Sequence, residues 1–176
     1  IAGLAVIVVP VVLTTLVAAG SNRPSIDFEG AGRGSLHPAL FLSMLSPDVF
    51  GATGNMSEYW GPPSFRWNDT GLYIAQNMGQ MYLGALPAVL LIWGFISGVL
   101  WQPGIRVFAI AFVFSIIYAL GWYTPVFKLV HATLPGVDLF RRPADAVFLI
   151  GFLASVLAGH ALNELLSAPA PRLERW

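Results

Sequence analysis

The sequence contains no cysteine and little charge. Without cysteine, the chain has neither a disulfide framework nor a thiolate metal site. Asp, Glu, Lys and Arg make up only 10% of its 176 residues, whereas a typical soluble domain carries about 25%. The 9 basic and 9 acidic residues give a net charge of +0, which excludes the basic surface of a nucleic-acid-binding protein. The 3 histidines are far apart in sequence and offer no close metal-ligand spacing.

Apolar residues are abundant instead, at 56% of the chain, and the mean hydropathy is +0.71. A chain this short cannot bury so much apolar surface in one soluble core, so the excess must face lipid or other subunits. Crossing a bilayer takes about 20 mostly apolar residues. Four stretches approach that length: residues 1–19, 81–100, 107–122 and 146–162. We therefore predict an all-α polytopic membrane protein, a single helical region with about four transmembrane helices.

The first residue, Ile1, lies directly in an apolar run, with no preceding Met and no basic segment of the kind that opens a secretory signal. We therefore expect the sequence to begin inside a helix of a longer protein. The remaining N-terminal part would then be a partner of this region, and the chemistry is expected to lie there.

Two long polar loops separate the apolar stretches, at about residues 20–80 and 123–145. In the first loop, Ser35–Leu45 has the spacing of a short amphipathic helix with Ser35 as its cap. In the second, Thr124 and Pro125 predict the cap and first residue of another short helix. The Lys and Arg density of the short link and the C-terminal tail favours a cytoplasmic location for these, with both long loops extracytoplasmic, although the Arg pair at 141–142 argues against it.

Several short motifs follow one another along the chain. They are His37–Phe41 (HPALF), Ser46–Gly51 (SPDVFG), Tyr59–Pro62 (YWGP), Tyr82–Pro87 (YLGALP), Gly121–Val126 (GWYTPV), Leu134–Gly136 (LPG) and Phe140–Ala144 (FRRPA). Their order and spacing resemble the C-terminal region of the YfhO-like family of bacterial membrane proteins, over roughly residues 37–162. That family is assigned to the C-type membrane glycosyltransferase fold.

The resemblance implies a multi-pass enzyme of the bacterial inner (cytoplasmic) membrane. It would transfer a sugar from a polyprenyl-phosphate donor to a cell-envelope glycan or lipid-linked acceptor on the extracytoplasmic side. The catalytic acid of this fold usually lies in the first external loop, which this sequence does not contain, so no catalytic residue is assigned. A divalent cation is compatible with such chemistry, but nothing in this sequence indicates a cofactor. The family tends to place a second Arg shortly after the Pro of its Phe-Arg-x-Pro motif, where Asp145 stands here. That departure implies a different ligand or reliance on Arg142.

The Arg pair before the last apolar stretch is the sharpest candidate for a donor-phosphate site. Arg141 and Arg142 would lie at headgroup depth, where a guanidinium fork binds phosphate in a bidentate way, and Lys128 would add charge. The plainer alternative is that these side chains extend to lipid headgroups or lie on a solvated helix face.

Aromatic residues of the first loop are candidates for sugar or acceptor contact. Tyr59 and Trp60, with Trp67, offer ring faces that suit pyranose rings, and His37 offers a hydrogen-bonding group. Alternatively, these aromatics hold the loop on the membrane surface. Two other functions stay open: a transporter or flippase, which would need ionisable residues inside its spans, and a non-enzymatic membrane scaffold subunit.

Overall fold

The computed structural model describes residues 2–20, 26–51, 58–64, 66–67, 70–72, 81–134, 136–139 and 142–167. Across these residues all regular structure is helical, which confirms the all-α prediction. The elements, with η for 3-10 helices, are α1 (Ala2–Ala19), α2 (Phe28–Gly32), η1 (Pro38–Met44), α3 (Ala85–Ile96), η3 (Val99–Trp101), α4 (Arg106–Ala119), η4 (Gly121–Tyr123), α5 (Pro125–Thr133), η5 (Val137–Leu139), η6 (Pro143–Ala146) and α6 (Val147–Ser167).

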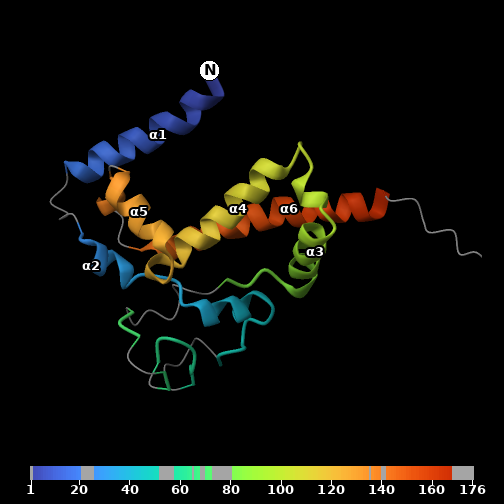
Figure 1. The fold of residues 1–176 in the computed structure, drawn as a ribbon, viewed down its shortest axis with the longest axis horizontal. Coiled ribbons are helices and arrows are strands. Elements are labelled where there is room, and N and C mark those ends of the chain that lie inside the picture. The colour runs from blue at the N-terminus through green and yellow to red at the C-terminus, as the bar shows by residue number, and fades with distance from the viewer. Residues whose placement is uncertain are drawn as a thin grey trace, which may run out of the picture.

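The packed core lies where α6 contacts α3 and α4 (Figure 1). Residues three and four apart on α6 form its buried face: Ile150, Leu153, Ala154, Leu157, Ala158 and Ala161. Opposite this face, a Cβ added to Gly94 of α3 would lie 3.3 Å from the Cβ of Ala161 and 2.8 Å from Leu100. Small residues therefore allow the backbones of α3 and α6 to approach closely, as they do between membrane helices.

The four predicted spans are not confirmed as membrane-crossing helices. Within the described residues, only Pro143–Ser167, 25 residues long, has the length and apolar composition to cross a membrane. The 12 residues of α3 and the 14 of α4 rise about 18 and 21 Å at 1.5 Å per residue, against about 30 Å of hydrocarbon. Gly84 and Gly98 have positive φ angles of 88° and 82° and stand at the two ends of α3. The apolar stretch 81–100 therefore extends beyond both ends of α3.

Helix α1 differs from the core helices because it lies apart from them, near η5 and α5 (Figure 1). Its large side chains from Val8 to Val17 are 44–73% exposed. The hydroxyls of Thr14 and Thr15 donate to the carbonyls of the residues four positions earlier, so neither is left without a partner. The described part of α1 is thus an apolar helix with a largely exposed surface.

The two long loops meet at one end of the core, and the short link between α3 and α4 lies at the other. Helix α4 ends and α6 begins at the loop end, while Ser97–Ile105 connects α3 to α4 at the opposite end. The short helix predicted at Ser35–Leu45 is the 3-10 helix η1, and its N-cap is His37 rather than Ser35. Ser35 does not cap η1 because its hydroxyl is used in contacts with the residues around it.

Candidate functional site

Three segments that are far apart in sequence meet where α4 ends and α6 begins. The Leu36 amide donates to the Ala119 carbonyl at 2.8 Å, and the Ala144 amide donates to the Gly34 carbonyl at 3.0 Å. The chain that leads into η1 is therefore tied to the end of α4 and to the start of α6. We call this meeting place the motif junction, which consists of Gly34–His37, Gly121–Tyr123 and Arg142–Ala144.

Ser35 is the buried polar group of the motif junction, with 6% of its surface exposed. Its hydroxyl donates to the Gly32 carbonyl and accepts from the Trp122 amide at 3.0 Å. Gly121 lies against it with a φ of 55°, and a Cβ there would overlap Ser35 Oγ and approach Pro143 to 2.8 Å. Both the positive φ and the close contact require glycine at this position.

The indole of Trp122 covers the motif junction from the side of α2. A Cβ on Gly32 would come within 2.7 Å of this ring, and one on Gly71 within 3.0 Å. As predicted, Thr124 is the N-cap residue of α5 and Pro125 its first residue, but the Thr124 side chain makes no capping hydrogen bond. Its hydroxyl instead donates to the Ile117 carbonyl at 3.0 Å, because the corner folds back on the last turn of α4.

His37 stands at the start of η1, where its Nδ1 accepts from the Ala39 amide at 3.2 Å. Its ring contacts Trp67 at a centroid distance of 5.0 Å and Tyr123 at 5.4 Å, both edge-on. Partial burial lowers the pKa of His37 below its ordinary 6.5, because burial disfavours the charged imidazolium. The neutral ring then carries its proton on Nε2 and can donate it to a ligand.

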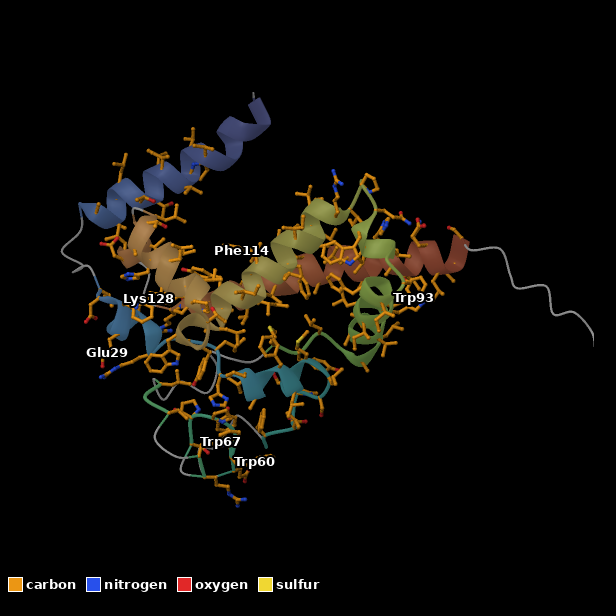
Figure 2. The ribbon with its side chains drawn as sticks, viewed as in Figure 1. Glu29, Trp60, Trp67, Trp93, Phe114 and Lys128 are labelled. Atoms are coloured by element: carbon orange, nitrogen blue, oxygen red, sulfur yellow. The ribbon has the colours of Figure 1, made fainter. Side chains whose placement is uncertain are left out.

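The predicted phosphate-binding cations are placed only in part. Arg142 is an exposed member of the motif junction, directly before the buried Pro143. Lys128 is exposed one turn into α5, at the end of the molecule that also holds Glu29 (Figure 2). Arg141 lies outside the described residues. The structure thus brings Arg142 and the His37 segment together at the motif junction. Lys128 lies outside the junction, on α5, the helix that follows η4.

The three loop aromatics have different environments, although Trp60 and Trp67 lie close together (Figure 2). Tyr59 is only 2% exposed and donates its hydroxyl to the Pro62 carbonyl at 3.0 Å, so it supports the loop from inside. Burial raises the pKa of the Tyr59 phenol above its ordinary 10.0. Trp60 is 40% exposed, and the Trp67 indole donates to its carbonyl at 2.8 Å. Of the sugar-stacking candidates, Trp60 and Trp67 keep accessible surface and Tyr59 does not.

An apolar groove of about 430 Å³ lies between η1, α3 and α4. Its lining residues are Phe41, Met44, Leu45, Ala88, Leu91, Ile92, Phe95, Ile96, Phe112 and Ile116. The floor includes the buried Leu91 and Phe112, whereas Ile92 and Ile96 on the rim are 55% and 82% exposed. Since every lining side chain is apolar, the groove suits a hydrocarbon chain rather than a polar molecule.

Charged groups of the described residues do not gather into a metal site. No three His, Asp or Glu side chains among them lie close enough to hold a metal ion. Arg33 and Glu29 of the α2 region pair at 3.8 Å with more than half of each side chain exposed. Such an exposed pair contributes little to stability.

The sequence alone does not identify Ser35 and Gly121 as partners. The spacing of 86 residues between them gives no local signal, and the buried hydroxyl only becomes recognisable once the chain is folded. A glycine directly after an apolar helix, followed by two aromatics and Thr-Pro, was the available hint for a tight corner.

Comparisons with protein-family models, with curated protein sequences and with solved structures find no match to this chain. The resemblance to the YfhO-like family therefore stays a prediction, and the motif junction carries the functional argument.

Proposed function

We propose that this chain is part of an integral membrane glycosyltransferase of the bacterial inner membrane. It would take a sugar from a polyprenyl-phosphate donor and pass it to a cell-envelope glycan or lipid-linked acceptor on the extracytoplasmic side. One observation carries the proposal: described ends of three separate sequence motifs meet at the motif junction. His37 of the first motif contacts Tyr123 of the second, and Ala144 of the third is bonded to Gly34, three residues before His37. Motifs that meet in space form a shared site more readily than motifs that only share a sequence order.

The membrane location is supported by the apolar surface of the helices. Besides α1, the outer faces of α4 and α6 expose large side chains, including Phe114 at 49%, Phe148 at 82% and Phe152 at 61%. Monomeric soluble proteins rarely expose contiguous apolar patches of such extent. In our proposal α1, α3, α4 and α6 all lie in the bilayer, and the short α3 and α4 are accommodated by local thinning.

The donor's two chemical parts match two adjacent features of the structure. The phosphate would bind the Arg142 guanidinium, with Lys128 and Arg141 as further cations and the His37 Nε2 proton as a neutral donor. The hydrocarbon chain would enter the apolar groove. Helix η1 links both features, since His37 precedes it and Phe41 and Met44 line the groove. Its 7 residues span roughly 14 Å at about 2 Å per residue.

The sugar would lie over the exposed loop aromatics. Trp60 and Trp67 lie together, and the contact between Trp67 and His37 joins this pair to the motif junction. Aromatic faces suit the apolar faces of pyranose rings. Tyr59 is left out of this role because it is buried.

The test is the double substitution Arg141→Ala and Arg142→Ala in membranes that contain the full protein. Sugar transfer from a polyprenyl-phosphate sugar is measured at several donor concentrations. We expect KM for the donor to rise about tenfold or more, because a hydrogen bond to a charged group contributes about 1.5–3 kcal/mol. Arg106→Ala is the matched control, since this exposed Arg lies at the other end of α4.

Unchanged transfer in the double variant would refute the donor site. An equal loss in Arg106→Ala would show that the defect is one of folding or insertion. Movement of the lipid across the bilayer without sugar transfer would instead support the flippase alternative.

A further inference from the structure

His37 and His131 lie in the two long loops and have opposite roles in their hydrogen bonds, since one ring accepts and the other donates. At His37, the Ala39 amide is the donor, so Nδ1 must be the unprotonated acceptor at 3.2 Å. At His131, Nε2 lies 3.2 Å from the Ile26 carbonyl, which can only accept, so this nitrogen must carry the proton. Adding a second proton therefore breaks the bond at His37 and leaves the bond at His131 intact.

The hydrogen bond at His37 gives the Ala39 amide a partner that the helical hydrogen bonds of η1 do not provide. The first helical hydrogen bond of η1 runs from the Leu40 amide to the His37 carbonyl, which leaves the Ala39 amide to the imidazole. An N-terminal amide without a helical partner needs such a side-chain acceptor. His37 thus caps η1 only while its ring is neutral.

The same ring connects two other parts of the chain. Trp67 of the first loop and Tyr123 of the α4–α5 corner each contact it edge-on, from different elements. Among the described residues whose rings contact His37, Tyr123 is the one with an ionisable side chain, and neither it nor Trp67 is a carboxylate. Burial, rather than a charged neighbour, lowers the pKa of His37. No charge from these neighbours would therefore compensate an imidazolium.

We propose that His37 is an acid-sensitive clasp that holds the start of η1 against Trp67 and Tyr123 when neutral and releases it when protonated. Protonation at Nδ1 removes the acceptor for the Ala39 amide and directs a second N–H at that amide, so that two donors face each other. The clasp concerns the loop and the motif junction themselves, and it does not depend on which molecule the junction binds.

The direction of the pH effect follows from the lowered pKa. The released form takes up a proton near the ordinary value of 6.5, whereas the clasped form resists it. The clasp is therefore fully formed above that pH and is lost as the pH falls through the lowered value.

The test is hydrogen exchange of the segment that covers residues 37–45, read by mass spectrometry on the full chain in bilayer nanodiscs. Rates at about pH 7.5 and about pH 5 are corrected for the intrinsic pH dependence of exchange. We expect about fivefold faster corrected exchange at the acid pH in the wild type, the change that loss of a cap produces. His37→Asn should abolish the difference, because Asn is a good cap that does not titrate.

His131→Asn is the matched control and should keep the acid-induced difference. The clasp would be overturned by a wild type without a difference, or by a His37→Asn variant that retains it. A second measurement reads the ring itself: nitrogen-15 NMR of histidine-labelled protein should show Nδ1 of His37 unprotonated at neutral pH. Because His131 has the same unprotonated nitrogen, the His37 signal is assigned from the spectrum of His131→Asn. A proton on Nδ1 of His37 at neutral pH would also overturn the proposal.

Discussion

Helices α1 and α6 are both long and apolar, at 18 and 21 residues, but they meet their surroundings differently. Along α6, a buried face that includes Leu157 and Ala161 packs on α3 and α4, and the start of the helix is fixed by the motif junction. Along the described part of α1, large side chains are exposed, and the helix touches the η5 region, where Thr15 lies against Gly136. Apolar length alone therefore does not create a packing face, which in α6 combines large and small residues at helical spacing against α3 and α4.

The largest effect is expected where α6 is anchored. Gly121→Ala should lower the free energy of unfolding by about 4 kcal/mol, from strain at a positive φ together with the overlap on Ser35. Gly98→Ala is the matched control: it also has a positive φ, of 82°, but no atom lies within 4 Å of the added Cβ. This control should cost only about 1 kcal/mol. Denaturant titrations in detergent micelles measure both, and equal losses would mean that the motif junction does not anchor α6.

The next effect compares the two helices directly. Leu157→Ala, at a position with 0% exposure, should cost about 3 kcal/mol because it leaves a cavity between α6 and its neighbours. Leu13→Ala in α1, where the side chain is 56% exposed, should cost less than about 0.5 kcal/mol in the same titration. A comparable loss at Leu13 would break the distinction between the packed and the exposed helix.

The smallest effect is expected in the first loop, where the buried ring of Tyr59, rather than a helix face, makes the packing contacts. Tyr59→Phe should cost about 1 kcal/mol at neutral pH because the bond to the Pro62 carbonyl is lost. The raised pKa adds an alkaline signature: the contribution of Tyr59 is complete below its ordinary 10.0 and is lost as the pH rises through the raised value. Stability measured across the alkaline range should thus fall more steeply in the wild type than in the variant. Parallel curves would show that Tyr59 is solvated.

Helix content and position were predictable from the sequence, because long uncharged runs leave few alternatives to helix. The ends of α3 were not, since Gly84 and Gly98 lie inside or beside the apolar run and only their positive φ marks the boundaries. The cap of η1 was assigned to Ser35 by residue type, whereas the fold uses Ser35 to bind Trp122, a partner 87 positions away. Propensity rules describe neighbours in sequence, and the motif junction is made of contacts between distant segments.

The candidate site was predictable in its residue types but not in its geometry. His37 and Arg142 were singled out, and the fold brings their segments to one junction. Tyr59 was grouped with Trp60 because both are loop aromatics, and only the folded chain separates the buried ring from the exposed one.

The most direct test of the account is labelling of the protein in bilayers with a lipid-soluble photoreactive carbene reagent, mapped by mass spectrometry. If the exposed apolar faces contact lipid, the label should concentrate on residues 8–17 of α1 and on Phe148 and Phe152 of α6, and should spare Leu157 and Ala161. Equal labelling of exposed and buried residues, or no labelling of α1 and α6 at all, would contradict the membrane location on which the proposed function rests.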